Sequence, residues 1–501
     1  MGEKLGSGKG TDGASMAEYE VNVGMECHAE LLTESKMFCG CRNEFGGEPN
    51  TRTCPVCLGL PGSLPVFNKA AVEHVVRTAL ALNCEISLQT IFHRKNYFYP
   101  DLPKGYQISQ YGDTPIGTNG YLEIEKADGT TKRIHITRVH LEEDTGKSIH
   151  GSAGGGGGAG ASVMDYNRSG VPLMEIVTAF PPDVASAEEA SLYGETLRSV
   201  LLYLGASDGR MEQGSLRVEP NPSVRVVGSD GFGTKTELKN LNSFRSVQRG
   251  VDYELKRQSA LIERGEAVVQ ATYGWDDDKG VTVLQRLKEA EQEYRYFPEP
   301  DLIPIEFLPE YIEEVRRGLP ELPSARKRRL TTAYGLTDAE AAQIASDRAL
   351  ADYFEEAAKG VGDPKLAANW LLGDLTRLAN AGGTAVYSTP VVPATLAGMV
   401  RLIEVGTLTG KLAKVLIEEM YATGKTAPQL IDEQGLKVTG TDEVEGIVAR
   451  VVAANPDVVA KIKAGADKSK SFLVGQVMKE TKGRARPDDI SRLLDAELAK
   501  N

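Results

Sequence analysis

The stretch YEVNVGMECHAEL, residues 19–31, decides the fold of the first part of this 501-residue chain. Its alternate positions are apolar or small: Tyr19, Val21, Val23, Met25, Cys27, Ala29 and Leu31. Because strand side chains alternate between two faces, this pattern predicts a half-buried β-strand. The other face carries Glu26 and His28 side by side. They form either a solvent-facing surface or part of a hard-metal site, which takes carboxylate oxygens and can add an imidazole.

The composition is that of a globular protein of two or three domains. The formal net charge of −13 gives no whole-chain sign of nucleic-acid binding, although a local basic face would suffice for it. No apolar run approaches a membrane span and no signal peptide is visible, so we expect a cytoplasmic protein without membrane contact. The six cysteines all precede residue 85, which in a reducing compartment favours a metal site over disulfides.

Two glycine-rich stretches imitate nucleotide-binding loops. Residues 1–16 lack the first glycine of a phosphate loop, because Glu3 stands in its place, and we expect a disordered extension. Residues 151–162 contain GxGxxG, but no strand leads into a helix across them. We therefore expect a flexible surface loop there.

The chain changes character after YFPEPDLIPI, residues 296–305. Before it, strand patterns such as TKRIHITRVHLEED (131–144) mix with helical ones such as FNKAAVEHVVRTALALN (67–83), where Asn68 is a candidate N-cap. After it, helical patterns run to the C-terminus, for example DEVEGIVARVVAANP (442–456). The sequence therefore predicts an α+β fold.

Two close cysteine pairs predict a metal centre. Cys39 and Cys41 form CxC, and Cys54 and Cys57 form CxxC a short loop later. Four thiolates from two tight turns are what tetrahedral zinc requires. With four protein ligands the site is closed, so we expect a structural zinc. The alternative is four unrelated buried thiols.

The stretch HRKNYFYPDLPKGYQISQY, residues 93–111, gathers cations and tyrosines. Arg94, Lys95 and Lys104 with Tyr97 and its neighbours suit phosphates and bases. A tyrosine-rich loop packed on a sheet explains the stretch equally well.

A strand that ends in acids points to a metal. HLEEDTGKSIH, residues 140–150, carries Glu142, Glu143 and Asp144, followed by Lys147. Like charges repel at such a spacing, and a bound cation relieves the repulsion. Glu175 stands in the apolar run PLMEIV, where an acid is costly to bury unless it is paired or bound to metal.

Five segments together resemble the B-type subunits of the aspartyl/glutamyl-tRNA(Asn/Gln) amidotransferases. They are HRKNYFYPDLPKGYQISQ, HLEEDTGKSIH, DYNRSGVPLMEIV, ELKNLNSFRSV and YRYFPEPDLIP. The resemblance covers nearly the whole chain after residue 17. The chain departs from the family pattern at Cys27, and in RVEPNPSVR at Glu219 and Pro220. The glycine-rich stretch resembles an insertion.

The resemblance implies an ATP-dependent reaction on misacylated Glu-tRNA(Gln) or Asp-tRNA(Asn). ATP phosphorylates the side-chain carboxylate of the attached amino acid, and ammonia then displaces phosphate to leave the amide. Partners implied are an A-type amidase subunit that supplies ammonia, a small C-type subunit, and in some assemblies the non-discriminating aminoacyl-tRNA synthetase. Implied cofactors are ATP and Mg²⁺, with structural Zn²⁺ dispensable for the chemistry.

The resemblance also implies residues and domains. His28, Glu143 and Glu175 are the implied magnesium ligands, with Glu26 beside them in the catalytic site. The implied nucleotide contacts are Arg94, Lys95, Tyr97, Lys104 and Lys147. A cradle-like catalytic domain with mixed and antiparallel sheets is expected over 17–305, an all-α domain over 306–425 and a small helical tail over 426–501. The tail is expected to bind tRNA phosphates through its cations, which are Lys468, Lys470, Lys479, Lys482, Arg484 and Arg486.

Three rival functions fit parts of the sequence. A non-catalytic zinc-bearing tRNA-binding scaffold would leave the acids merely structural. A self-sufficient glutamine amidase would need a nucleophile with an activating partner, and no Cys–His or Ser–Lys arrangement of that kind is visible. The related archaeal enzyme dedicated to Glu-tRNA(Gln) has a large extra domain, for which this chain has no room.

Overall fold

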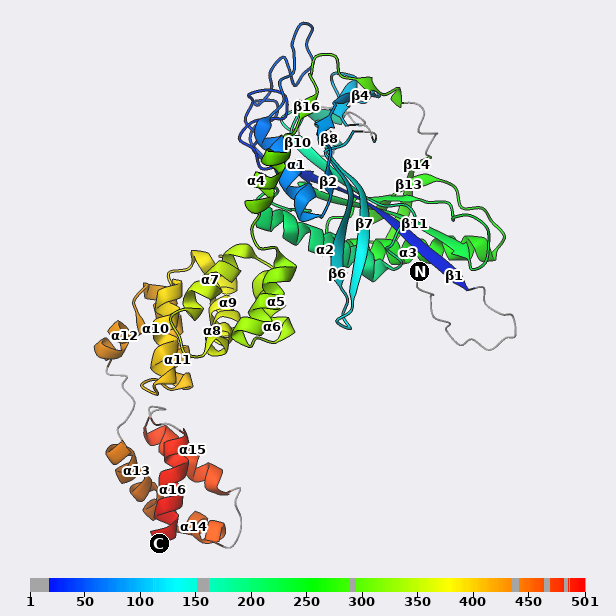
Figure 1. Cartoon of the computed structure of the whole chain (residues 1–501). Helices are drawn as coiled ribbons and strands as arrows, with labels where there is room; N and C mark the ends of the chain where they lie inside the picture. Colours follow the sequence, from blue (N-terminus) through cyan, green and yellow to red (C-terminus); the bar gives the residue numbers. More distant parts are fainter. Residues whose placement is uncertain are drawn as a thin grey trace. The chain divides into compact units, whose positions relative to one another are not determined.

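The computed structural model describes residues 18–110, 112, 114–150, 162–287, 294–434, 441–463, 469–481, 485 and 487–500. The expected N-terminal extension and all but the last residue of the glycine-rich stretch lie outside them. By its internal contacts the chain divides into two compact units, Met1–Leu322 and Pro323–Asn501 (Figure 1).

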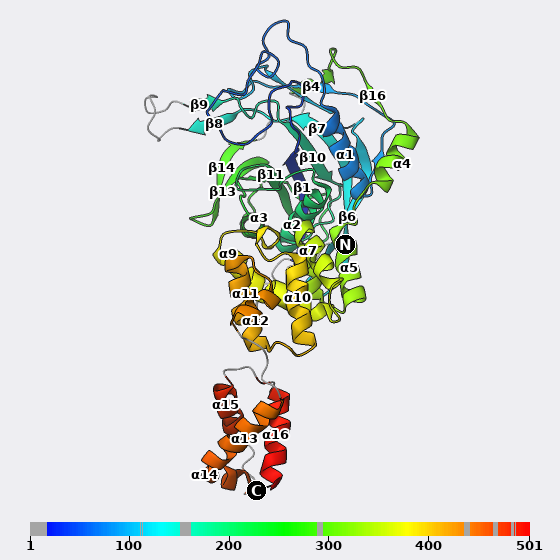
Figure 2. The same ribbon diagram turned by 90° about the vertical axis from the view of Figure 1, so that its left-hand side faces the viewer.

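A sheet of antiparallel strands forms the centre of the first unit (Figure 2). Within the described residues it has six strands, and every neighbouring pair in it is antiparallel. In spatial order they are β11 (Leu216–Val226), β1 (Tyr19–Glu30), β10 (Pro172–Thr178), β7 (Thr131–Glu143), β6 (Gly117–Glu125) and β2 (Glu85–Ile86).

Smaller sheets surround the central one. They are β12 (Glu237–Lys239) with β13 (Ala271–Asp276) and β14 (Val281–Leu287), β15 (Phe297–Pro298) with β4 (His93–Asn96) and β5 (Tyr106–Ser109), β16 (Ile305–Glu306) with β3 (Gln89–Thr90), and β8 (Lys147–His150) with β9 (Ser162–Asp165). Only the β12–β13 pair is parallel among the described strands. Strands in the first unit and helices in the second confirm the α+β fold.

β1 has the predicted alternation of buried and half-buried residues. Its apolar face belongs to the core of the first unit, which α1 (Lys69–Ala81), α2 (Ala187–Leu204) and α3 (Phe244–Glu263) complete. Asn68 caps α1 as predicted, because its side chain accepts hydrogen bonds from the amides of Ala70 and Ala71. Since α1 and α2 contact β6 and α2 contacts β1, helices cover one face of the sheet and leave the other for polar groups.

The first unit extends further than the sequence indicated. α4 (Pro309–Arg317) follows β16, and both Phe307 and Ile312 are buried in the core of the first unit. The boundary between the units therefore lies after Leu322, not after residue 305.

The second unit is helical and has two separate cores. The first is built from α5 (Pro323–Tyr334), α6 (Asp338–Ala345), α7 (Arg348–Ala358), α8 (Pro364–Trp370), a π turn (Leu371–Leu375), α9 (Thr376–Ala381), a 3₁₀ turn (Val386–Ser388), α10 (Pro393–Glu404), α11 (Gly410–Thr423) and α12 (Ala427–Gln434). The second is built from α13 (Thr441–Ala454), α14 (Pro456–Lys463), α15 (Lys470–Glu480) and α16 (Pro487–Lys500).

The tail core begins later than the sequence indicated. Leu430 and Ile431 of α12 are buried in the first helical core, so that α12 does not belong to the tail expected from residue 426. The predicted apolar stripe of α13 is buried in the tail core, for example at Val444 and Val448. In the part of the chain that the structure describes, no helix combines the length and apolarity needed to cross a membrane.

Candidate functional site

The face of the central sheet that the helices do not cover carries a row of charged residues across four strands, and their side chains are buried or half-buried. Arg217 of β11 stands opposite His28 of β1, His28 opposite Glu175 of β10, and Glu175 opposite His140 of β7. Residues directly opposite in antiparallel strands project to the same face, so the register itself assembles the row.

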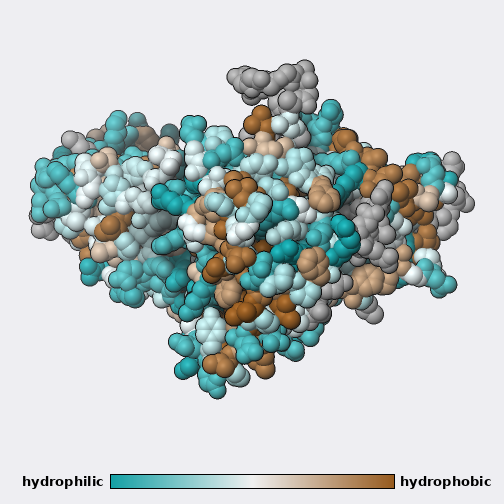
Figure 3. Space-filling model, turned by 90° about the horizontal axis from the view of Figure 1, so that it is seen from above, coloured by the Kyte–Doolittle hydropathy of each residue, from teal (hydrophilic) through white to brown (hydrophobic). Residues whose placement is uncertain are grey.

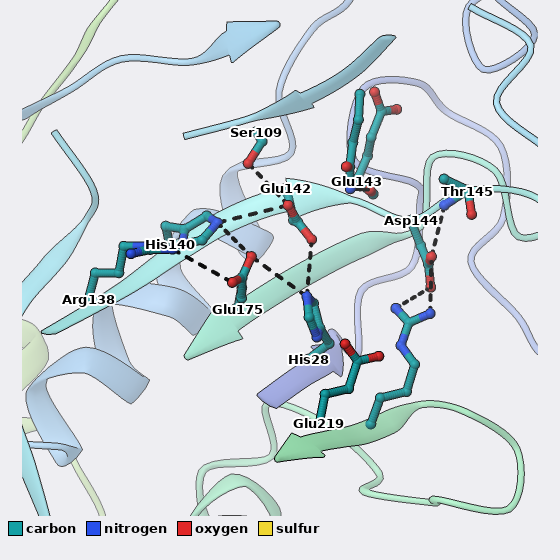
Figure 4. A network of polar contacts seen from close by, with 12 residues as sticks. His28, Ser109, Arg138, His140, Glu142, Glu143, Asp144, Thr145, Glu175 and Glu219 are labelled. Carbon is teal, nitrogen blue, oxygen red and sulfur yellow. Dashed lines mark hydrogen bonds and ion pairs between the residues drawn. The ribbon is translucent and has the colours of Figure 1, made fainter. Parts of the chain in front are cut away.

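Three of these strands bring an imidazole and two carboxylates together. His28 Nε2 lies 3.7 Å from Glu142 Oε1 and 3.6 Å from Glu175 Oε2. Figure 4 shows the three side chains pointing toward one another, with His140 on the other side of Glu175. His140 Nε2 lies 3.1 Å from Glu175 Oε2. Ser109 Oγ donates a hydrogen bond of 3.1 Å to Glu142. We call His28, Glu142 and Glu175 the histidine–glutamate cluster.

The electrostatics of the histidine–glutamate cluster follow from burial and charge pairing. Burial would raise the pKa of Glu175, but the charge of His140 and the hydrogen bonds of both imidazoles hold it well below its usual range. Burial would lower the pKa of His28, but its hydrogen bond to Glu175 and the charges nearby raise it to about 9. One ligand atom from each cluster residue lies within 4.8 Å of the others. Two carboxylates and one imidazole at this separation fit a hard divalent cation.

Glu143, the predicted magnesium ligand on β7, does not join this cluster. Its carboxylate pairs with the ammonium of Lys104 and accepts a hydrogen bond of 2.9 Å from the amide of Ile108. Successive residues of a strand project to opposite faces, and Glu142 is the one that faces His28. In this structure Glu142, and not Glu143, is therefore the glutamate of β7 that lies with His28 and Glu175, while the expected set His28, Glu143 and Glu175 stays a prediction about magnesium.

A second acid cluster lies next to the first. Glu26, Glu219 and Glu237 each bring one carboxylate oxygen within 4.8 Å of the others, and we call them the glutamate cluster. Lys239 Nζ lies 3.0 Å from Glu219 Oε2 and 3.6 Å from Glu237 Oε1. Asn221 Nδ2 donates a hydrogen bond of 3.2 Å to Glu26. Burial, together with the charge of Glu175 in the neighbouring cluster, raises the pKa of Glu26.

Lys95 is the predicted nucleotide contact that faces these acids. Its ammonium lies 5.0 Å from the ring centre of Tyr294. Burial would lower the pKa of Lys95, but the charges of Glu142 and Glu175 help to outweigh burial and raise it. Lys95 is therefore a half-buried cation whose charge acts on the histidine–glutamate cluster.

The other predicted nucleotide contacts have partners of their own or lie at the surface. Arg94 and Lys95 are successive residues of β4 and therefore project to opposite sides of the strand. On its own side Arg94 donates two hydrogen bonds, of 2.6 and 2.8 Å, to Glu299. The hydroxyl of Tyr97 donates to Gln107 at 3.4 Å. Lys147 is exposed at the start of β8.

A pocket of about 290 Å³ opens between the cysteine-bearing loop and β4–β5. Arg94, Lys104 and Glu143 line one side of it, and Cys57 and Leu60 belong to the loop side. Two of the predicted nucleotide contacts thus line this pocket.

The four cysteines of the predicted zinc site converge. One sulfur atom of each of Cys39, Cys41, Cys54 and Cys57 lies within 4.8 Å of the others, and all are free thiols. The hydrogen bond from Cys39 lowers the pKa of Cys57 to about 5, so that a thiolate forms readily at that position. Lys36 lies buried beside them, with Nζ 3.8 Å from Cys57 Sγ and 2.8 Å from the carbonyl oxygen of Arg52. The donor set fits tetrahedral zinc.

Sequence reasoning missed His140, Glu237 and Lys239 as site residues, and it named Glu219 only as a departure from the family pattern. For His140 a signal existed, because it stands two residues before Glu142 on a predicted strand and therefore on the same face. Glu237 and Lys239 come from β12, which belongs to another sheet, and no local pattern connects them with β1.

The structure describes only part of the basic stretch of the tail. Lys470 pairs with Asp495 at 2.6 Å, and Lys479 is exposed in the last turn of α15. The other predicted phosphate contacts, Lys468, Lys482, Arg484 and Arg486, lie outside the described residues.

Two family models match the chain. The GatB/GatE catalytic domain matches residues 21–313, and the GatB domain matches residues 352–498. The curated protein of Carboxydothermus hydrogenoformans named as the B-type subunit of aspartyl/glutamyl-tRNA(Asn/Gln) amidotransferase is 51% identical over 486 residues, which cover 97% of this chain and 100% of the relative. Proteins of the same name from Moorella thermoacetica and Thermoanaerobacter sp. strain X514 are 52% and 50% identical, and each alignment covers 96% of this chain and 100% of the relative.

Proposed function

Because the chain belongs to the family of B-type subunits of aspartyl/glutamyl-tRNA(Asn/Gln) amidotransferases, we propose that it activates and amidates the amino acid carried by a misacylated tRNA. The substrate is Glu-tRNA(Gln), Asp-tRNA(Asn) or both. An oxygen of the side-chain carboxylate attacks the γ-phosphorus of ATP, and ADP leaves. Ammonia then attacks the acyl carbon of the resulting acyl phosphate. Phosphate leaves, the nitrogen loses a proton, and the amide remains.

The observation that carries this proposal is the convergence of His28, Glu142 and Glu175 from three strands of one sheet. Phosphoryl transfer needs positioning and charge neutralisation more than covalent help. In our proposal these three residues hold Mg²⁺, which when bound neutralises the charge that develops on the transferring phosphoryl group. Lys95 is half-buried and its pKa is raised by the charges of Glu142 and Glu175, so in our proposal it is the cation of the predicted set that contacts the phosphates.

Zinc belongs to a different part of the proposed function. In our proposal Cys39, Cys41, Cys54 and Cys57 hold a structural Zn²⁺ that fixes the loop along the pocket. Four thiolates leave no open position for a substrate or a water, so zinc takes no part in the reaction.

The ammonia comes from a partner in this proposal, an A-type amidase subunit joined through a small C-type subunit. The cysteines of this chain offer no glutaminase nucleophile, because four gather in the zinc site and Cys27 and Cys84 are buried. Burial raises the pKa of Cys84 to about 12, which keeps that thiol protonated. We expect the complex to be cytoplasmic and, in some assemblies, joined by the non-discriminating synthetase.

The first unit offers apolar surface for such partners. Figure 3 shows apolar residues gathered among polar ones on one face of the molecule. Near the pocket, Leu64 is 63% exposed and Phe98, beside β4, is 83% exposed. In our proposal these exposed apolar side chains form part of the surface that the partner subunits cover.

An amidation assay with defined tRNAs tests the proposed function. The purified complex with its partners receives Glu-tRNA(Gln) or Asp-tRNA(Asn), glutamine and either ATP or a non-hydrolysable analogue. We expect amide formation on at least one tRNA, together with one ADP for each amide. No amidation of either tRNA, together with no ATP hydrolysis that depends on misacylated tRNA, would favour a non-catalytic tRNA-binding scaffold.

The tail, α13–α16, is the part that we propose to bind the tRNA body. It has a core of its own, so its removal after residue 434 leaves the other two cores complete. We expect the truncated protein to need a tRNA concentration about 10-fold higher for the same activity, because it lacks cations that bind the phosphates of the tRNA backbone. For the same reason its activity should depend less on salt concentration. Amidation measured against tRNA concentration at two salt levels checks this. An unchanged tRNA requirement would mean that the basic stretch is only a solvated surface.

A further inference from the structure

Two acid clusters lie next to each other on one face of the central sheet. Glu26 of the glutamate cluster and His28 of the histidine–glutamate cluster are two residues apart on β1 and project to the same side. Glu26 also stands directly opposite Glu219 in the β1–β11 pair. Each cluster alone has the ligand atoms of a divalent-cation site, so together they have the composition of a two-metal centre.

The glutamate cluster differs from its neighbour because a cation of the chain already lies in it. Lys239 reaches in from β12, and Nζ lies 3.0 Å from Glu219 and 3.6 Å from Glu237. The carboxylates of Glu219 and Glu237 are only 13% and 7% exposed, whereas the lysine side chain is 34% exposed. The ammonium thus uses oxygens that a metal ion would need, and it remains accessible from outside.

We propose that Lys239 is the built-in cation of the glutamate cluster, which excludes a second divalent ion and supplies a second positive charge beside a single metal at His28, Glu142 and Glu175. In two-metal enzymes the second ion stabilises one of the two oxygens of an in-line displacement. A lysine ammonium can contact a phosphate as a point charge and do the same. The use of that charge rests on the proposed function, while the exclusion of a metal rests on the contacts of Lys239 alone.

Metal stoichiometry tests the inference without reference to activity. Mn²⁺ is titrated into the zinc-loaded complex, and the electron paramagnetic resonance signal of free Mn²⁺ reports how many ions are bound. We expect Lys239→Gln to bind one Mn²⁺ more than the unaltered protein, because the carboxylates of Glu219 and Glu237 then lose their cation and are free to bind a metal together with Glu26. Lys239→Arg should bind the same number as the unaltered protein, since the charge is kept.

Lys132→Gln is the matched control. Lys132 also pairs with a buried carboxylate, that of Glu189 at 2.7 Å, with 25% of its side chain exposed. Its loss should leave the number of bound Mn²⁺ unchanged. An equal number in Lys239→Gln and the unaltered protein would overturn the inference.

The unaltered protein provides a second measurement should Lys239→Gln fail to fold. At excess Mn²⁺ its spectrum should show a single isolated ion in the centre. A spin-coupled pair would mean that metal displaces Lys239, and the inference would be wrong. If the unaltered protein binds no Mn²⁺ while Lys239→Gln binds one, the proposed magnesium site fails and the role of Lys239 stands.

Activity adds a test of the charge itself. With misacylated tRNA and ATP saturating, Lys239→Gln should lower kcat by about 10²-fold, the effect of removing one preorganised charge at a reacting oxygen. The KM for tRNA should stay within about 2-fold, and Lys239→Arg should recover part of kcat. A variant with unaltered kcat would remove the second half of the inference, the charge supplied to the reaction.

Discussion

The four-cysteine site and the histidine–glutamate cluster both bring together the ligand atoms of a metal site, but the chain assembles them in opposite ways. Cys39, Cys41, Cys54 and Cys57 come from one short loop. His28, Glu142 and Glu175 come from three strands that are distant in the sequence and adjacent in the sheet. A local centre depends on spacing, whereas a long-range centre depends on register. We therefore expect changes in the first to act mainly on stability and changes in the second mainly on chemistry.

The largest effect is expected at Glu142. Glu142→Gln keeps the shape of the side chain but removes a charged ligand, so we expect ATP-dependent amidation to fall by about 10²–10³-fold with little change in thermal stability. Mn²⁺ affinity, measured by calorimetry, should fall in parallel. Glu143→Gln is the matched control on the same strand and should keep Mn²⁺ affinity, because that carboxylate faces Lys104 and Ile108. If Glu143→Gln loses Mn²⁺ binding and Glu142→Gln keeps it, the ligand set read from the sequence was right.

That contrast shows what the sequence could predict. Alternation gave β1 and its polar face, and the CxC and CxxC spacing gave the cysteine group, because both patterns are local. The strand ending in LEED offered two neighbouring glutamates, and the choice between them depends on which one faces β10 across the sheet. The register of β7 with β10 decides this, since it places His140 opposite Glu175 and Glu142 on the same face. No local pattern contains that information.

The partners of the predicted cations were hidden for the same reason. Arg94 and Lys95 are equivalent in the sequence, yet Arg94 pairs with Glu299, a residue of another segment, while Lys95 lies where the charges of Glu142 and Glu175 act on it.

Domain boundaries depend on similar long-range packing. The sequence pattern places Phe307 in the helical region that follows it, yet its buried side chain belongs to the core of the first unit. In the same way the sequence pattern places α12 in the tail, yet the buried side chains of α12 belong to the first helical core.

An intermediate effect, on stability and not on chemistry, is expected at Cys54. Cys54→Ser removes one of four thiolates, and loss of a structural metal belongs to the substitutions that cost about 4 kcal/mol or more. Zinc content should fall, and the temperature of unfolding with it, while the Mn²⁺ affinity of folded protein stays unaltered. Elemental analysis and calorimetry measure these quantities. Cys84→Ser, a buried cysteine outside the group, should keep its zinc. Normal zinc content in Cys54→Ser would contradict a four-thiolate site.

The smallest effect is expected at Lys36, where the local centre meets the rest of the fold. Its ammonium donates to the carbonyl oxygens of Arg52 at 2.8 Å and of Tyr166 at 3.2 Å, and it lies 3.8 Å from Cys57 Sγ. Lys36→Met keeps the length of the side chain but leaves these acceptors unpaired, which costs about 1–3 kcal/mol. Four thiolates bound to one Zn²⁺ keep a net negative charge, which the Lys36 ammonium partly offsets. Lys36→Met removes this positive charge.

We therefore expect Lys36→Met to keep its zinc at purification but to release it a few-fold faster to a chromogenic chelator under native conditions. Lys359→Met is a suitable control, since Lys359 is exposed and forms a salt bridge with the exposed Glu356. Because Tyr166 lies in the segment that leads to β10 and Glu175, the variant also tests whether the two centres are linked. Faster zinc release with unaltered Mn²⁺ affinity would mean that the cysteine site stabilises its loop alone. A parallel loss of Mn²⁺ affinity would mean that Lys36, through its hydrogen bond to Tyr166, helps to hold Glu175 in the histidine–glutamate cluster in position.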